Sequence, residues 1–311
     1  MQLPILSTLL ALHLAVANGA LSKPALWPNL GKFSPDLTAG LPMPGYQVTQ
    51  WPAGTISQGC LYIADRDGQD PAFFRAYSVL LNDSWNFCIQ DGSKQSIDDL
   101  AFAFGQAPIR LRQYTSEVVM QSQGGGANAQ NQIITLYQPA TVQLFLHEMS
   151  HCADSAGGYK TPSSSASTAW SSSYDLDSAV PDTYAQTNQQ ENFAQFGGLI
   201  VYDRLTGGKL RDEPNLWEIG HQLNTMVDEG DNGQHGGRMY DFDSGLICSG
   251  RYANSPPVTM GSFVQSVDDK SQLDFIASFD LDKQVAFGSA NGITVETLIP
   301  ETGAPTQCFD V

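Results

Sequence analysis

The five residues 147–151, HEMSH, constrain the fold of this chain more than any other stretch of its 311 residues. Two histidines four positions apart lie on one face of an α-helix, where both imidazoles can bind the same metal ion. Glu148 then stands beside that ion, where it can accept a proton from a bound water molecule. The preceding residues, 140–146, have helical spacing and follow a proline. We therefore predict a helix over residues 140–153 that carries a metal site.

A catalytic zinc ion needs three protein ligands, and the motif supplies two of them, His147 and His151. The metzincin continuation H-x-x-G-x-x-H is excluded, because residue 154 is Asp. Three aspartates lie within reach along the chain, at positions 154, 175 and 177, but Asp175 and Asp177 lack the Gly-Thr-x-Asp setting of the aspzincins. Glu191 follows the capping pattern TNQQ (187–190) and begins an apolar helix expected over 191–205. Either a ligand role or a capping role suits a glutamate at that place.

The segment HEMSHCAD (147–154) resembles the H-E-x-x-H-x-x-D segment of the gluzincin metallopeptidases of the anthrax lethal factor and Pro-Pro endopeptidase group. In that group a tyrosine precedes the ligand glutamate by seven residues, and the ligand opens an E-x-x-A helix. Tyr184, Glu191 and Ala194 match this pattern here. Over residues 144–203 the resemblance implies that His147, His151 and Glu191 bind one Zn²⁺ per chain. It also implies that Glu148 is the general base and that Tyr184 stabilises the oxyanion.

Two neighbouring residues are expected to support the ligands. Asp154 is three positions after His151 on the same helix face, so it can orient a ligand imidazole; ordinary solvation at a helix end is the alternative. Gln195 stands where the gluzincin group often has a glutamate, four positions after the ligand. We expect this glutamine to remove a negative charge from the surroundings of the metal.

The wider layout is similar to a secreted family of filamentous fungi described as conidiation-specific. The similarity rests on Trp85-Asn86-Phe87-Cys88, a strand at 110–114, the HExxH segment and the E-x-F-A helix. This second resemblance implies a setting at the cell or spore surface and no particular activity. It supports an alternative function, a secreted structural protein that keeps a zincin fold with little or no turnover.

The first twenty residues carry no charged side chain and end in small residues, which predicts a signal peptide over 1–20 and a secreted protein. The net charge of −17 disfavours nucleic acid and anionic membranes as partners. We expect a monomer that acts on a peptide or protein substrate.

Five cysteines are an odd number for an oxidising compartment. We predict disulfides between Cys60 and Cys88 and between Cys248 and Cys308, which leaves Cys152 as a free thiol in the motif helix. The one glycosylation sequon begins at Asn82.

The predicted architecture is α+β and zincin-like, with a small twisted sheet, the HExxH helix and a second helix that carries Glu191. Its expected parts are the signal peptide (1–20), a Pro-rich lead-in (21–52), the zincin-like domain (53–290) and a C-terminal tail (291–311). Strands are expected near 59–64, 73–81, 109–120 and 132–137, a helix capped by Ser96 is expected to end near 104, and 161–173 is expected as a loop. Together these features predict a secreted zinc metalloendopeptidase.

Overall fold

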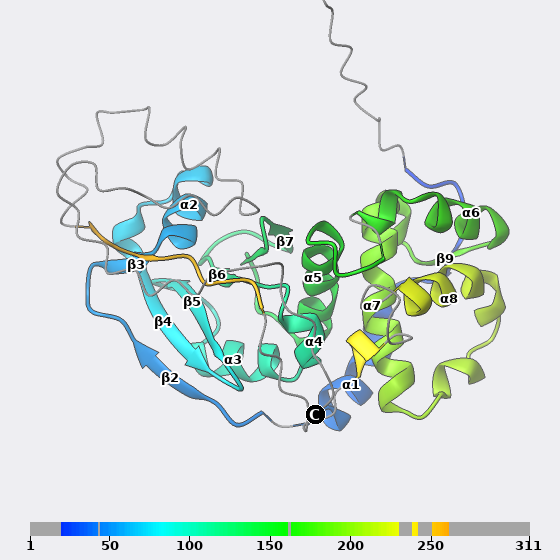
Figure 1. The fold of residues 1–311 in the computed structure, drawn as a ribbon, viewed down its shortest axis with the longest axis horizontal. Coiled ribbons are helices and arrows are strands. Elements are labelled where there is room, and N and C mark those ends of the chain that lie inside the picture. Colours follow the sequence, from blue (N-terminus) through cyan, green and yellow to red (C-terminus); the bar gives the residue numbers. More distant parts are fainter. Residues whose placement is uncertain (1–19, 43, 161–162, 230–237, 242–250, 261–311) are drawn as a thin grey trace, which may run out of the picture.

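A six-stranded sheet and a group of helices form the two sides of the molecule, with helix α5 (Val142–Ser155) between them (Figure 1). The computed structural model describes residues 20–42, 44–160, 163–229, 238–241 and 251–260. The mixed architecture confirms the α+β class. The order of strands in the sheet is β2 (Gln47–Gln50), β4 (Phe74–Leu80), β5 (Ser84–Gln90), β6 (Glu117–Met120), β8 (Ile133–Leu136) and β7 (Ala127–Gln130).

The sheet is antiparallel at both edges and parallel in the middle. β4 and β5 form a hairpin in which Phe74 faces Gln90, and β5, β6 and β8 run parallel. Every residue of β6 and β8 is buried, as expected for inner parallel strands that are covered on both faces. The strands predicted at 73–81 and 132–137 are confirmed.

Side-chain caps explain where the helices begin. Thr141 caps α5 and Ser96 caps α3 (Ile97–Gly105), as the hydroxyl of each accepts a hydrogen bond from a backbone N–H three residues on. Helix α7 (Gln189–Leu205) is capped by Asn188, whose side-chain oxygen accepts the backbone N–H of Glu191 at 2.9 Å. The capping pattern was therefore placed one residue too early, at position 187.

Three expectations about local structure are wrong, two of them for the same reason. Residues 59–64 belong to a helix, α2 (Gln58–Arg66), because Ser57 caps it. The expected loop at 161–173 contains α6 (Thr168–Leu176), capped by Ser167. The expected strand at 109–120 begins with a helical turn, α4 (Ile109–Arg112). In the first two cases a serine cap starts a helix where the composition had indicated a strand or a loop.

The segment expected as a lead-in is part of the fold. It forms β1 (Ala25–Trp27), a 3₁₀ turn η1 (Leu30–Phe33) and α1 (Ser34–Gly40), and it contributes β2 to the sheet. Its buried side chains include Trp27, Phe33 and Leu37, which join the main core. β1 pairs in parallel with β9 (Val180–Asp182), which leads into the site described below. The expected signal peptide and C-terminal tail lie outside the described residues.

The remaining elements complete the two sides of the molecule. Helix α8 (Gly220–Glu229), which the sequence did not predict, packs against α6 and α7. A second small sheet joins β3 (Thr55–Ser57) to β10 (Pro257–Thr259). Short 3₁₀ turns occur at η2 (Pro71–Phe73), η3 (Ser164–Ala166), η4 (Ala185–Thr187), η5 (Lys209–Asp212), η6 (Leu216–Ile219) and η8 (Arg238–Tyr240). Among the residues described, no helix is long and apolar enough to cross a membrane.

A glycine allows α5 and α7 to approach each other closely. A Cβ atom at Gly197 of α7 would lie only 2.0 Å from Oγ of Ser150, which stands between the two histidines of α5. Ser150 Oγ donates a hydrogen bond to the carbonyl of Leu146, so it is held within its own helix. Each helix is also packed against a further neighbour through aromatic rings, Phe145 of α5 against Phe104 of α3 and Phe193 of α7 against Trp170 of α6. The relative position of the two helices is thus fixed by packing.

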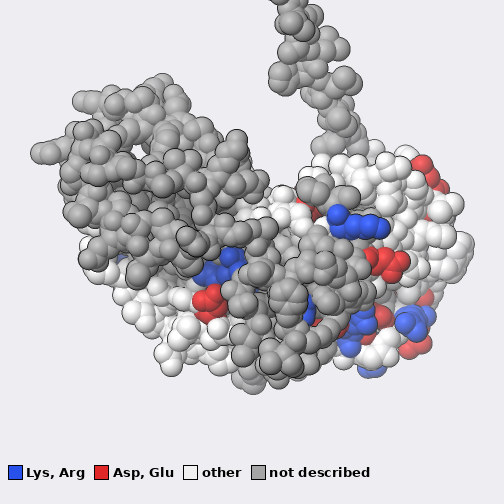
Figure 2. All heavy atoms as spheres, in the orientation of Figure 1, with Lys and Arg blue, Asp and Glu red and all other residues white. Residues whose placement is uncertain are grey.

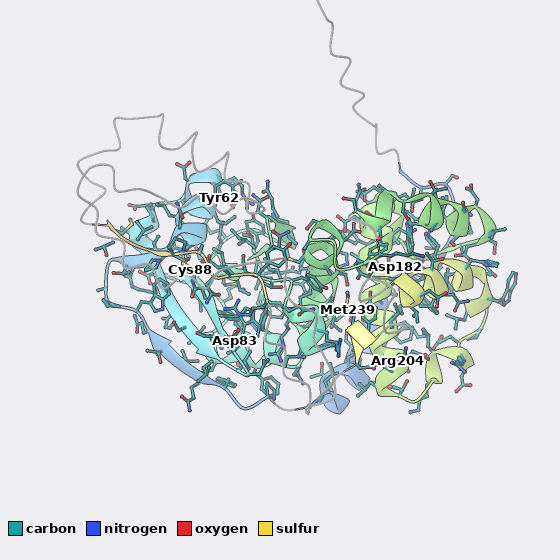
Figure 3. The ribbon with its side chains drawn as sticks, in the orientation of Figure 1. Tyr62, Asp83, Cys88, Asp182, Arg204 and Met239 are labelled. Atoms are coloured by element: carbon teal, nitrogen blue, oxygen red, sulfur yellow. A yellow bond between two sulfur atoms is a disulfide. The ribbon has the colours of Figure 1, made fainter. Side chains whose placement is uncertain are left out.

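The disulfide between Cys60 and Cys88 is confirmed and joins α2 to β5 (Figure 3). Because it closes a loop with a sequence separation of 28, the chain-entropy model assigns it roughly 3–4 kcal/mol of stability. Cys152 is a buried free thiol, as predicted. Cys248 and Cys308 lie outside the described residues. The sequon residue Asn82 lies at the β4–β5 turn, where its side-chain oxygen accepts a hydrogen bond from Arg112 at 3.3 Å; its glycosylation stays a prediction.

A buried carboxyl group links β3 and the residues just before β10 to the main sheet. Glu117 of β6 accepts hydrogen bonds from the hydroxyls of Ser57 and Ser255. Burial raises the pKa of Glu117 from its ordinary 4.5 to about 7, although these hydroxyl bonds act in the opposite direction. Between pH 4.5 and about 7, the folded protein therefore keeps a proton on Glu117, whereas the unfolded chain has released it.

Stability is expected to fall as the pH rises from about 4.5 to about 7, because the folded state binds more protons than the unfolded state over this range. The loss attributable to Glu117 is roughly 3 kcal/mol. Glu117→Gln should remove this part of the slope and be more stable than the unaltered protein at neutral pH. Denaturant unfolding at several pH values measures the effect, with Glu218→Gln as the control. Equal slopes for Glu117→Gln and the unaltered protein would refute the assignment.

Candidate metal centre

Three side chains from two helices converge on one point. Nε2 of His147 and Nε2 of His151 lie 3.0 and 3.2 Å from the same carboxylate oxygen, Oε2 of Glu191. The two imidazole nitrogens are 3.2 Å apart. Among the described residues, this is the group of histidine, cysteine and acidic side chains whose ligand atoms are close enough to hold a metal ion. The structure therefore brings together the three residues predicted as ligands and none of the three candidate aspartates.

The protonation of His147 follows from its neighbours. Nδ1 of His147 lies 3.2 Å from Oε1 of Gln195, and Nε2 of Gln195 lies 3.0 and 2.9 Å from the two carboxylate oxygens of Asp182. An ionised carboxylate only accepts hydrogen bonds, so the amide must turn its NH₂ group toward Asp182 and its oxygen toward the imidazole. Nδ1 of His147 is then the donor. In the neutral imidazole, Nε2 carries a lone pair that points at Glu191.

These atoms suit a divalent cation. A lone pair on Nε2 of His147 faces a carboxylate oxygen and a second imidazole nitrogen, which is unfavourable unless a proton or a cation lies between them. Tetrahedral ligands about 2.0–2.1 Å from zinc are separated by roughly 3.3 Å. The observed separations of 3.0–3.2 Å are close to that value. The residues present therefore fit a zinc ion.

The pKa values show how strongly the three groups interact. Burial raises the pKa of Glu191, but the hydrogen bonds and charges of His147 and His151 outweigh burial and hold it well below its ordinary value. Burial lowers the pKa of His147, and its bond to Glu191, with the charges of Glu148 and Glu191, raises it above the ordinary value overall. Without a metal, the site thus attracts a proton to the place that a cation would fill.

Glu148 lies next to the three ligands and is not one of them. Its side chain is buried, and Oε2 has no hydrogen-bond partner in the part of the chain that the structure describes. Burial raises the pKa of Glu148, while the charges of the two histidines act against the increase. A buried carboxylate oxygen without a partner is costly unless something binds to it. A water molecule at the site would satisfy it.

Tyr184 lies at the entrance of the site. Its ring centroid is 5.6 Å from that of His147, and half of its surface is exposed. Burial, followed by the charges of Glu191 and Glu148, raises the pKa of Tyr184 to about 12. The phenol therefore remains protonated and can donate a hydrogen bond. The side chains of His147, His151 and Glu191 are 10, 18 and 20 % exposed, so a small group can reach them.

The candidate aspartates have other partners. The carboxylate of Asp154 accepts hydrogen bonds from the backbone N–H and the hydroxyl of Ser165, and within the described part of the chain it has no hydrogen bond to a histidine. Its expected contact with a ligand imidazole is therefore not seen, because η3 folds back onto this end of α5. Asp177 caps α8 through the N–H groups of His221 and Gln222. Asp175 is exposed on α6.

Sequence reasoning missed Asp182. It is the only carboxylate among the described residues that is hydrogen-bonded to Gln195, and it lies beside α7 (Figure 3). Gln195 was expected to remove a charge from the surroundings of the metal, but the structure supplies that charge from β9. The one available signal was the position of Asp182 two residues before Tyr184. Sequence spacing alone does not show that β9 runs beside α7.

The fold and the cluster define an α+β protein whose HExxH helix is completed by a glutamate from a second helix. Residues 34–270 match the family described as conidiation-specific protein Con-13, and the chain belongs to that family. A curated relative, conidiation-specific protein 13 of Neurospora crassa, is 28 % identical over 168 residues, which cover 51 % of this chain and 49 % of the relative. The chain thus spans about half the length of the relative that it matches. No solved structure matches the chain.

The family confirms the second of the two resemblances found in the sequence. The matched range contains both α5 and α7, so the candidate site lies within it. The name of the family refers to conidiation and states no reaction. On the part of the face in Figure 2 that is not grey, acidic and basic side chains lie near one another.

Proposed function

We propose that this chain is a secreted, zinc-dependent peptidase with a zincin-like site. His147 and His151 of α5 and Glu191 of α7 would hold the ion. Zinc bound by three protein ligands polarises a substrate carbonyl and lowers the pKa of a water molecule at its open position. The fungal family, the confirmed disulfide and the uncharged N-terminal stretch support secretion.

The roles of the protein groups follow from their positions. Glu148 accepts a proton from the attacking water, since no described residue forms a hydrogen bond with its buried Oε2. Tyr184 donates a hydrogen bond to the oxyanion of the tetrahedral intermediate, since its hydroxyl stays protonated beside Glu191. Gln195 holds the imidazole of His147 so that Nε2 would face a bound ion.

One observation carries the proposal: a buried carboxylate, one oxygen of which has no hydrogen-bond partner among the described residues, stands beside three converging lone-pair donors. A metal site that serves only the fold is closed and needs no general base. A fourth group that accepts protons next to the ligands is what water activation requires.

The direct test is digestion of a peptide library by the purified chain. We expect cleavage products that disappear when a chelator is added and return with zinc. The same preparation carrying Glu148→Gln serves as the control for contaminating proteases. Cleavage that persists in that variant, or that resists chelation, would show that the activity does not come from this site.

A second candidate function is favoured by the name of the family. A conidiation-specific protein with a structural role at the spore or cell surface would use the three-residue cluster as a structural metal site and would not hydrolyse peptides. In that case zinc removal should lower the melting temperature, and no peptide in the library should be cut. Digestion of the peptide library by one preparation of the protein therefore distinguishes the two functions.

Tyr184→Phe is expected to keep zinc and the fold, and to reduce turnover by about 10²–10³-fold, the usual cost of one lost oxyanion donor. The ring remains and half of it is exposed, so packing changes little. The measurement is kcat on a cleaved peptide, together with zinc content. An unchanged kcat would exclude the hydroxyl from catalysis.

A further inference from the structure

Beside the cluster lies a third acidic residue, after Glu191 and Glu148, that contacts no ligand directly. Asp182 is the last residue of β9. Its carboxylate accepts hydrogen bonds from the side-chain amide of Gln195 and from the backbone N–H of Ala185, each with a nitrogen–oxygen distance of 2.9 Å. It is 2 % exposed. Asp182 therefore joins two features of the site, the amide that faces His147 and the turn η4 that follows Tyr184.

We propose that Asp182 is a positioning residue that fixes the tautomer of His147 through Gln195. The effect of Asp182 on catalysis rests on the proposed function. The tautomer of His147, in contrast, can be measured in the metal-free chain. The ionised carboxylate accepts from both sides, so Gln195 has one favourable orientation. Its oxygen then faces Nδ1 of His147, which keeps the proton on Nδ1 and leaves Nε2 free to bind a cation.

The effect of removing the charge follows from the hydrogen-bond inventory. Asparagine at position 182 can donate as well as accept, so it can pair with either end of the Gln195 amide. When the amide is reversed, its NH₂ group faces Nδ1 of His147, and the imidazole proton moves to Nε2. That tautomer cannot bind zinc through Nε2. Asp182→Asn should therefore weaken zinc binding although the substitution keeps the size of the side chain.

The parallel pair β1–β9 adds a consequence for the fold. Trp27 lies opposite Asp182 in the register, and Trp27 is buried in the main core. The N-terminal strand thus holds the strand that carries Asp182. The segment that sequence reasoning regarded as a lead-in supports the residue that orients a predicted ligand.

The test uses the full chain in its metal-free and zinc-loaded forms. Nitrogen NMR of the metal-free protein at alkaline pH, where imidazole is neutral, should show the proton of His147 on Nδ1, while Nε2 of His151 carries the proton that lies between the two imidazoles and Glu191. In Asp182→Asn a population with the proton on Nε2 of His147 should appear, and zinc affinity should fall by about 10–100-fold. The exposed Asp175→Asn makes the same change in charge away from the site and should alter neither measurement.

The double variant Asp182→Asn/Gln195→Glu supplies a rescue. A carboxylate at position 195 accepts directly from Nδ1 of His147, and the new asparagine can donate to it, so the tautomer and most of the zinc affinity should return. A role confined to the turn after Tyr184 would lower turnover and leave tautomer and affinity unchanged, and that result would overturn the inference. An Nε2–H tautomer of His147 in the unaltered metal-free chain would overturn it as well. Failure of the unaltered chain to bind zinc would instead refute the proposed function, because the tautomer is measured without metal.

Discussion

Glu148→Gln is expected to bind zinc normally and to lose about 10²–10⁴-fold in peptide hydrolysis, the usual contribution of a general base. The carboxylate is not among the three converging ligand atoms, so replacing it with an amide leaves the ligand set intact. An amide has no basic oxygen that can accept a proton from water at neutral pH. The change is nearly isosteric, so the buried environment of the side chain is preserved.

Zinc content and kcat are measured on the same sample of this variant. Its unfolding free energy is expected to be equal to or higher than that of the unaltered chain, because burial disfavours the charged carboxylate that is removed. Hydrolysis at the original rate with full zinc content would exclude Glu148 as the base. Loss of zinc would mean that Glu148 belongs to the ligand set.

Glu191→Ala is expected to lose nearly all bound zinc and, with it, all hydrolysis that depends on the ion. Glu191 supplies the one oxygen to which both imidazole nitrogens point. Two histidines alone hold zinc poorly. The variant should still fold, because Asn188 caps α7 through the backbone N–H of residue 191, and this bond does not need the glutamate side chain.

Asp175→Ala is the matched control for Glu191→Ala, since it also removes one acidic side chain and lies outside the cluster. It should keep its zinc. Full zinc content in Glu191→Ala would move the third ligand elsewhere in the chain. It would also remove the basis for comparing this protein with gluzincins.

The local elements that the sequence predicted best are those with a strong period or a clear cap. The motif helix, the helix behind Ser96 and the strands at 73–81 and 132–137 have such signals. The failures at 59–64 and 161–173 occurred where a single serine cap starts a helix, in a short apolar run in the first case and in a Ser-rich stretch in the second. The N-terminal segment was misjudged for a different reason, since the pairing of β1 with β9 joins residues about 155 positions apart in the sequence.

The candidate site could be anticipated in part. The spacing of His147 and His151 on one helix face needs only local geometry, so it was readable from the sequence. The approach of Glu191 depends on Gly197 and Ser150, whose close contact lets α7 lie against α5. The contact of Asp182 with Gln195 depends on the placement of β9, for which the sequence has no local signal. Long-range packing, not motif spacing, therefore completes the cluster.

The central claim is that the three converging side chains bind zinc. Elemental analysis of the purified chain, prepared without added metal and after dialysis against metal-free buffer, tests it most directly. We expect about one zinc per chain, and we expect His147→Ala and His151→Ala to lose most of it. Absence of zinc from the unaltered protein, with no uptake when zinc is supplied, would contradict the account.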